Sequence, residues 1–306
     1  MASQIRSVAL AGATGNVGVP TLKALLETGK FDVTVLIRPG SPHKFPSGVQ
    51  VKEVDMASSE SLIAALRGQD AVVNATSVPD PSAHIRFVDA AIKAGVRRLI
   101  PADFGSDPAR VGTPGEFPVF GFKTATFAHL QEITKNSKLG SLTWTVVSNG
   151  WFLDWNLENG WMGIDIHKKQ AEITSGGNVP TFFTTLETIG KAVASVLLHP
   201  AETENRVVYI KSVWKTQNEL LALAQEALGA DDWKITHQDH KEMYDWSMAE
   251  MKKRNFDLPV IMHQIRRTMA DPVIAEPPAE WANDLLGLKT MTDEEVKEMI
   301  KRLVSQ

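Results

Sequence analysis

Three glycines with a characteristic spacing carry the clearest chemical signal, in the segment Gly12-Ala13-Thr14-Gly15-Asn16-Val17-Gly18. Gly12 allows a sharp turn, Gly15 removes a side chain where a pyrophosphate would approach the backbone, and Gly18 lets a following helix lie close. The free N–H groups and the dipole at a helix start bind phosphates. The spacing predicts a dinucleotide-binding loop, provided that a strand precedes it and a helix follows.

The elements around these glycines supply that context. Ser7 to Ala11 is an apolar run typical of a buried strand, and Val19 to Thr28 has helical spacing with Pro20 tolerated in its first turn. The alternation continues with strands at 32–38, 50–55, 71–75, 97–101 and 142–147 and helices at 59–66, 83–94 and 122–136. Alternating strands and helices predict an α/β fold, a doubly wound parallel sheet of the Rossmann type.

The pattern changes after Asn149. Leu186 to Leu198 predicts a helix and Arg206 to Ile210 a strand, whereas the chain from Gln217 onward is mainly helical and ends in an amphipathic helix at 293–303. We therefore expect a Rossmann domain at residues 1–152, completed by parts of 181–212. Residues 153–306 would form a smaller, mainly helical C-terminal region that binds the substrate.

Composition excludes several classes of protein. The 306 residues carry a net charge of −4 and no cysteine, which excludes disulfides and thiolate catalysis and gives no electrostatic case for nucleic acid. No apolar stretch is long enough to span a bilayer, and we interpret the N-terminal apolar run as a strand, not a signal peptide. His237 and His240 lie in a polar stretch without metal-ligand spacing. We expect a cytoplasmic monomer or homodimer that binds a small molecule and neither metal, membrane nor nucleic acid.

The end of the second strand indicates which dinucleotide would be bound. NAD sites tend to carry an acidic residue there, but here the strand ends in Arg38, with Lys44 nearby. A guanidinium suits a 2′-phosphate, which a carboxylate would repel. The pattern favours NADP(H), although Arg38 as a solvated charge at a strand end is the alternative interpretation.

Several segments together resemble a known family. They are GATGNVG, LIRP, VDAAIKAGVRRLIPADFGSDP, the segment ending in Lys123, TTLETIGKAVASVLLHP and SVWKTQNELLALAQEALG. In this combination the sequence is similar to the NmrA-like, isoflavone-reductase-like branch of the atypical short-chain dehydrogenases, which includes phenylcoumaran benzylic ether reductases and pinoresinol–lariciresinol reductases. The resemblance covers about two thirds of the chain. It implies a Rossmann domain, a smaller substrate domain and a role in secondary metabolism.

The resemblance also implies functions for individual residues. Lys123 matches the catalytic lysine of the reductases, and Phe104 matches an aromatic residue near the nicotinamide. The residues implied to contact the cofactor, to which Lys44 is added for its position near Arg38, are Gly12, Thr14, Gly15, Asn16, Val17, Gly18, Arg38, Met56, Asn74, Ala75, Thr76, Phe104, Lys123, Asn149 and Phe152.

Lys123 is the candidate acid or base. Many short-chain dehydrogenases carry a tyrosine four residues before the lysine, but here that position is Val119, and Tyr209 and Tyr244 are far away in sequence. A buried lysine can transfer protons if its pKa is lowered, or it can simply hold the nicotinamide ribose. His84 could reach the site from a helix start, but we interpret it as a surface or capping group.

Aromatic residues follow the last predicted strand. Trp151, Phe152, Trp155 and Trp161 lie beyond its carboxyl end, where ligands bind in open α/β sheets. With Phe104 they are the candidate substrate contacts and suit an aromatic ligand, but tryptophans pack cores as readily as they line pockets.

Three functions remain open. The first hypothesis is an NADPH-dependent reductase of a small aromatic or alkaloid-like metabolite, with hydride passing from nicotinamide C4 and Lys123 managing the proton. The second is a redox-neutral cyclase on the same scaffold. The third is a dinucleotide sensor that catalyses no reaction.

Overall fold

The computed structural model describes residues 4–111, 118–136, 141–272 and 274–305. The chain forms two compact units. The first comprises residues 1–148, 186–210 and 284–288, and the second comprises residues 149–185, 211–283 and 289–306.

The first unit is built on a seven-stranded parallel sheet. Its strand order is β11-β6-β5-β4-β1-β2-β3, which has the doubly wound reversal between β1 and β4. The strands are β1 (Ser7–Ala11), β2 (Asp32–Ile37), β3 (Gln50–Glu53), β4 (Ala71–Asn74), β5 (Arg98–Ile100), β6 (Thr143–Ser148) and β11 (Arg206–Tyr209). The α/β fold class expected from the sequence is confirmed.

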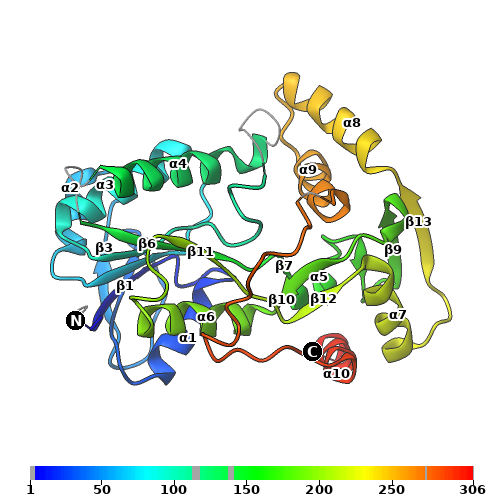
Figure 1. The fold of residues 1–306 in the computed structure, drawn as a ribbon, viewed down its shortest axis with the longest axis horizontal. Helices are drawn as coiled ribbons and strands as arrows, with labels where there is room; N and C mark the ends of the chain where they lie inside the picture. Colours follow the sequence, from blue (N-terminus) through cyan, green and yellow to red (C-terminus); the bar gives the residue numbers. More distant parts are fainter. Residues whose placement is uncertain (1–3, 112–117, 137–140, 273, 306) are drawn as a thin grey trace. The chain divides into compact units, whose positions relative to one another are not determined.

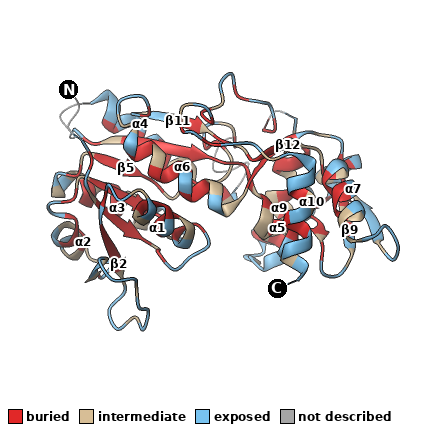
Figure 2. Cartoon of the chain, turned by 90° about the horizontal axis from the view of Figure 1, so that it is seen from below, coloured by how far each residue is buried: buried red, intermediate tan, exposed pale blue. Residues whose placement is uncertain are grey.

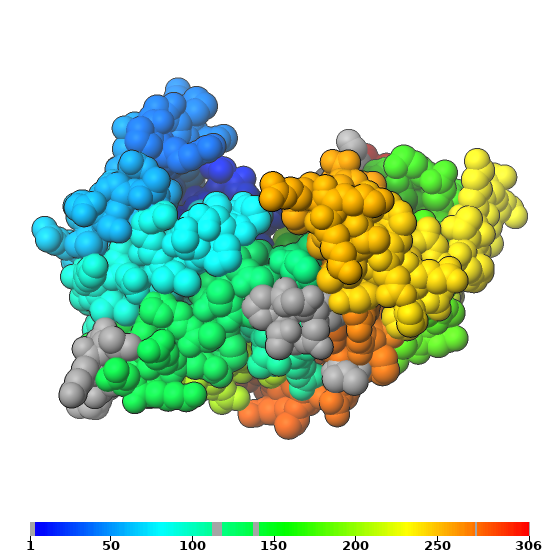
Figure 3. Space-filling view, turned by 90° about the horizontal axis from the view of Figure 1, so that it is seen from above, coloured from blue at the N-terminus to red at the C-terminus, as the bar shows by residue number. Residues whose placement is uncertain are grey.

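Helices cover both faces of this sheet (Figure 1). They are α1 (Gly18–Glu27), α2 (Ser59–Leu66), α3 (Pro81–Ala94), α4 (Gly121–Lys135) and α6 (Leu186–Leu198), with a 3₁₀ turn, η1, at Pro118–Phe120. Helices α2, α3 and α4 lie on one face and α1 and α6 on the other. In the space-filling view of Figure 3 the atoms of α3 and α4, in cyan and green, form a continuous layer.

The core beneath α2, α3 and α4 explains why these segments are helical. Leu62, Phe87, Leu130 and Trp144 belong to one buried apolar cluster, each 8% exposed or less. Figure 2 shows the central strands of the sheet buried and the outward helix surfaces exposed. This amphipathic arrangement is the one that the 3.6-residue periodicity predicts.

The second unit combines helices with two three-stranded sheets, ordered β12-β10-β7 and β13-β9-β8. Its strands are β7 (Trp151–Phe152), β8 (Ile164–Asp165), β9 (Gln170–Thr174), β10 (Thr181–Thr184), β12 (Val213–Lys215) and β13 (Lys234–Gln238). Its helices are α5 (Leu153–Asn159), α7 (Gln217–Leu228), α8 (His240–Lys252), α9 (Leu258–Ala270) and α10 (Asp293–Val304), with a 3₁₀ turn, η3, at Ser175–Gly177.

These small sheets were not predicted from the sequence. The strands have two to five residues, which is too short for an alternating pattern to stand out. In β13 the first four residues are exposed, so the strand lacks the buried face that would mark it. Helix α10, by contrast, was predicted because Val296, Met299 and Ile300 form a buried stripe.

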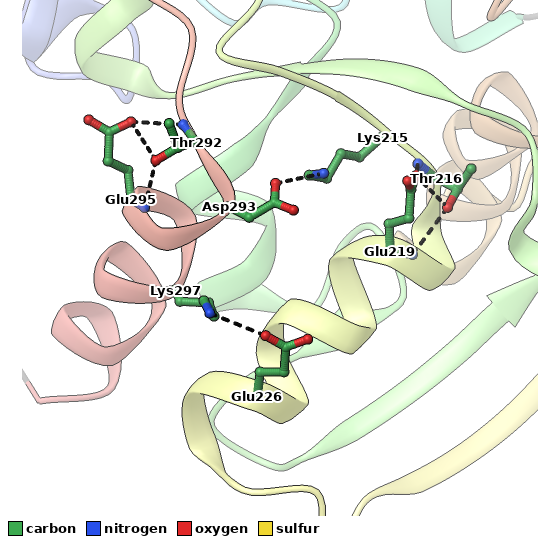
Figure 4. Close-up of polar contacts among 8 residues, drawn as sticks. All are labelled: Lys215, Thr216, Glu219, Glu226, Thr292, Asp293, Glu295 and Lys297. Carbon is green, nitrogen blue, oxygen red and sulfur yellow. Dashed lines mark hydrogen bonds and ion pairs between the residues drawn. The ribbon is translucent and has the colours of Figure 1, made fainter.

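Helices α7 and α10 begin in the same way (Figure 4). Each starts with a capping box. The threonine hydroxyl accepts a hydrogen bond from the backbone N–H of the glutamate three residues later, and the glutamate carboxylate accepts one from the backbone N–H of the threonine. In α10 these residues are Thr292 and Glu295. The two helices are also linked by an ion pair between Lys297 and Glu226, with an N–O distance of 3.2 Å.

We expect Thr292→Ala to lower the free energy of unfolding of the second unit by about 1 kcal/mol, because the Glu295 N–H loses its acceptor. Urea denaturation followed by tryptophan fluorescence measures the change. Thr290→Ala, at an exposed position outside the box, is the matched control. Equal stability of the two variants would show that the cap contributes nothing.

Candidate functional site

The turn between β1 and α1 requires glycine at two positions for steric reasons. Gly12 has φ +79°, and a Cβ there would lie 2.5 Å from the Ala75 carbonyl oxygen. A Cβ on Gly18 would lie 1.9 Å from the Gly12 carbonyl oxygen. Gly15 differs, because its Cβ would meet nothing closer than 3.4 Å. Thus Gly12 and Gly18 allow close packing, whereas Gly15 leaves the outer side of the loop open.

The start of helix α1 has the properties of a phosphate site. Its N-cap is Val17, which offers no side-chain cap, whereas the α3 N-cap Asp80 accepts a bond from the Ser82 N–H. Thr14, Gly15 and Asn16 are exposed at the tip of the loop. An anion at this helix start would satisfy backbone N–H groups that no side chain caps.

The ends of neighbouring strands lie next to this loop. Asn74, at the end of β4, is 4% exposed, and its side-chain oxygen accepts from the Thr76 N–H at 3.1 Å and the Thr76 hydroxyl at 2.7 Å. This arrangement holds the segment containing Ala75 against Gly12. The segment is therefore a rigid edge along which a dinucleotide backbone could lie.

The residues that are candidates for binding the adenosine end of a dinucleotide follow strands β2 and β3. Arg38 and Lys44 are exposed, so both side chains are accessible to a ligand. Met56 is partly buried against the apolar cluster beneath α2 to α4. The first residues after β2 include no acidic side chain, since Arg38 is followed by Pro39 and Gly40.

Lys123 lies in the first turn of α4 and contacts the loop that follows β5. Its amine donates to the Phe104 carbonyl oxygen at 2.7 Å and lies 5.9 Å from the centroids of the Phe120 and Phe122 rings. A Cβ on Gly105 would lie 3.3 Å from the Lys123 nitrogen. Burial lowers the pKa of Lys123, and the charge of Asp103 opposes this shift.

The loop that follows β5 is anchored to the sheet. Gly105 forms a parallel β-bridge with Ser148, whose hydroxyl donates to the Gly105 carbonyl oxygen at 3.1 Å. Farther along, the Tyr209 hydroxyl donates to Asp107. The pKa of Tyr209 is raised by burial and by this bond. Tyr209, which is far from Lys123 in sequence, therefore lies on β11 and contacts the loop that carries Asp103 and Phe104 through its bond to Asp107.

Asp103 is the most unusual group in this unit. It is 1% exposed, and neither carboxylate oxygen accepts a hydrogen bond from any residue that the structure describes. Burial is the main cause that raises the pKa of Asp103 to about 7. The charge of Lys123 opposes this shift, and the charge of Asp107 adds to it. Such a group can gain or lose a proton near neutral pH.

The interpretation of His84 as a surface or capping group is wrong. The ring is 3% exposed and stacks on Phe122 with centroids 4.9 Å apart, and Nε2 lies 2.6 Å from the Val78 carbonyl oxygen. Burial is the main cause that lowers the pKa of His84, and the charge of Lys123 lowers it further. The cap of α3 is Asp80, so the histidine instead supports the residue that precedes Lys123.

The remaining candidates belong to the second unit. Trp151 is 8% exposed within its apolar core, which supports the interpretation as a core residue for this tryptophan. Trp155 and Trp161 are partly exposed and contact each other with centroids 5.2 Å apart. Asn149 is fully buried and its side chain donates to the Gly150 carbonyl oxygen, while Phe152 is the partly buried N-cap of α5.

The described residues lack two other kinds of site. In this part of the chain no three His, Asp or Glu side chains are placed to hold a metal ion. Among the same residues, no helix combines the length and the apolar character that crossing a membrane requires.

Comparison with known proteins identifies the family. A family model described as NAD(P)H-binding matches residues 12–199. The oxidoreductase aprR of Aspergillus flavus is 31% identical over 260 residues, covering 84% of this chain and 86% of that protein. The oxidoreductase poxI of Penicillium oxalicum is 33% identical over 220 residues, covering 72% and 69%. The chain belongs to the NAD(P)H-binding, NmrA-like oxidoreductases.

A solved structure supports the fold of this NmrA-like protein. The structure of AtPrR2 with NADP+ and (+)-pinoresinol matches it with a TM-score of 0.77 and 21% identity, covering 99% of this chain and 100% of the other. The isoflavone-reductase-like resemblance seen in the sequence is confirmed. The glycine turn and the uncapped helix start fit a dinucleotide.

Sequence reasoning missed two features of this NmrA-like site. Asp103 lies in the segment ADFG, but the residue type alone does not predict that it is buried with no hydrogen bond from a described residue. Tyr209 was set aside for its distance along the chain, although β11 pairs with β6 and brings it to the same sheet edge as Ser148. The strand predicted at 206–210 was the sequence signal that could have placed Tyr209 in the sheet.

We expect Gly18→Ala and Gly15→Ala to behave differently. The first places a methyl group on the Gly12 carbonyl and lowers the melting temperature strongly, whereas the second melts close to the unsubstituted protein. Differential scanning fluorimetry provides the comparison. Equal melting temperatures would contradict the assignment of Gly18 as the glycine required for close packing.

Proposed function

We propose that this protein is an NADPH-dependent reductase of a small aromatic or alkaloid-like metabolite. The observation that carries the proposal is the Lys123 amine, desolvated and bonded to Phe104 on a loop at the carboxyl edge of the sheet. When bound, the nicotinamide would supply a hydride from C4 to an electrophilic carbon of the substrate. Lys123 would donate the proton that the substrate's heteroatom requires.

Arg38 supports NADP(H) over NAD(H). Its exposed guanidinium follows β2, where the 2′-position of the adenosine ribose is read in this fold. Lys44 adds a second exposed positive charge a few residues later. The AtPrR2 structure named above contains NADP+, which agrees with this choice.

The aromatic substrate class rests on two observations. The same AtPrR2 structure contains (+)-pinoresinol, an aromatic ligand. In this chain, the partly exposed pair of Trp155 and Trp161 offers flat apolar surface with indole N–H donors. We propose this pair as an aromatic-binding surface of the second unit. For the first unit we propose Phe104 as a contact of the nicotinamide.

We expect Arg38→Glu to weaken NADPH binding about ten- to hundredfold, since a charge-assisted bond is replaced by repulsion. NADH binding should change little, because NADH has no 2′-phosphate. Isothermal titration with both cofactors measures the preference. Arg67→Glu, the same charge change at an exposed position after α2, is the control. Unchanged NADPH affinity in Arg38→Glu would remove the cofactor assignment.

We expect the protein to consume NADPH with a member of an aromatic substrate panel, followed at 340 nm, the usual NADPH absorbance. Lys123→Met should lower kcat about 10²–10⁴-fold, as for loss of a proton donor, while Lys135→Met in the last turn of the same helix should not. Product formation without NADPH consumption would instead indicate a cyclase. Cofactor binding without any turnover would indicate a sensor.

A further inference from the structure

Asp103 is a buried carboxylate without the contacts of a structural aspartate. Asp70, in the same unit, accepts bonds from the N–H groups of Arg6 and Ser7 and from the Arg97 guanidinium, all within 2.9 Å. Asp103 accepts no bond from a described residue and is 1% exposed. Burying a carboxylate in this way is costly unless a nearby cation compensates for it.

The neighbouring acid, Asp107, already has partners. One of its oxygens accepts from the Ala109 N–H at 2.8 Å, and the other accepts from the Tyr209 hydroxyl and lies 3.7 Å from Arg110. Asp107 therefore anchors its loop to β11. Lys123 is the cation whose charge favours the ionised form of Asp103, and its amine is bonded to the carbonyl of the next residue, Phe104.

The forces on Lys123 oppose one another. Desolvation by burial favours the neutral amine. Asp103 is the group whose charge favours the ammonium form. A lysine that donates a proton must be protonated before the reaction. The opposing effects of burial and of Asp103 on the pKa of Lys123 therefore decide whether it can serve as the proton donor.

We propose that Asp103 is a positioning residue for Lys123, holding the amine in its protonated form beside the Phe104 carbonyl. This inference rests on the proposed function of Lys123 as proton donor. In the reaction the substrate carbon gains the hydride, its heteroatom gains a proton from the ammonium, and Lys123 is left as a neutral amine. A proton from solvent restores the ammonium, and Asp103 makes that return favourable.

The test compares the pKa of Lys123 in the unsubstituted protein and in Asp103→Asn. Competitive acetylation with acetic anhydride between pH 7 and 11, read out by mass spectrometry of the peptide containing Lys123, gives this pKa without any substrate. We expect Asp103→Asn to lower it by about one unit or more, as for removal of a neighbouring opposite charge. Asp103→Glu, which restores the charge, should bring it back.

Asp89→Asn is the matched control. It makes the same change on α3, where Asp89 bonds to His129 of α4 at 2.7 Å, and should leave the pKa of Lys123 unchanged. A Lys123 pKa that is the same in Asp103→Asn and the unsubstituted protein would overturn the proposal. If Asp103→Asn does not fold, the same titration of Asp103→Glu and Asp103→Ser decides, because only the former keeps a charge.

Different results would contradict the proposed reductase function and the proposed role of Asp103. Where NADPH turnover is found, Asp103→Asn should shift the alkaline limb of the pH–rate profile to lower pH by the same amount, a change that a purely structural residue would not produce. If the unsubstituted protein binds no NADP+ and has no turnover, the proposed function is lost. The acetylation titration still reports on the Asp103–Lys123 pair in that case.

Discussion

The approach of helix α1 to the turn that leaves β1 is the constraint on which the rest of the first unit depends. The backbone atoms at Gly18 and Gly12 are so close that a single methyl group would overlap them. A second close contact lies farther along, where a Cβ on Gly190 of α6 would be 2.4 Å from the Pro20 carbonyl oxygen. Helix α6 comes from the second half of the chain, and this contact joins it to the same layer as α1.

This packing directs the start of α1 toward the carboxyl edge of the sheet. The same edge carries Asn74 at the end of β4, the loop after β5 and Ser148 at the end of β6. The β-bridge between Gly105 and Ser148 extends the sheet by one step and holds the loop in place. As a result the Phe104 carbonyl is fixed where the first turn of α4 can deliver Lys123 to it.

The sequence predicted the first unit well, because its signals are local and repeated. Strands that alternate with helices, helices with a buried stripe and a glycine turn are all signals carried by residues close together in the sequence. The small sheets of the second unit depend on pairings between distant short segments, such as β13 with β9, for which no local pattern exists. Trp151 shows the same limit, since only the contacts of the fold place it in the core.

The candidate site was predictable in its residue types but not in its electrostatics. Lys123 and Phe104 followed from the resemblance, whereas the burial of His84 and Asp103 depends on how α3, α4 and the loop after β5 pack together. Burial is what changes the chemistry of a titratable group, so the same aspartate would be an ordinary acid on the surface. Local sequence therefore says little about which carboxylate is functional.

The cost of these buried charges supports catalysis over simple binding. A sensor needs the glycine turn and the strand edges, which bind a dinucleotide through backbone groups and need no buried acid. Burying Asp103 without a hydrogen bond from any residue that the structure describes opposes folding, and so does desolvating Lys123. Neither is needed to hold phosphates. Groups with strongly shifted pKa values gather where protons are transferred. The proposed reductase therefore gives the Asp103–Lys123 pair a use that the proposed sensor does not.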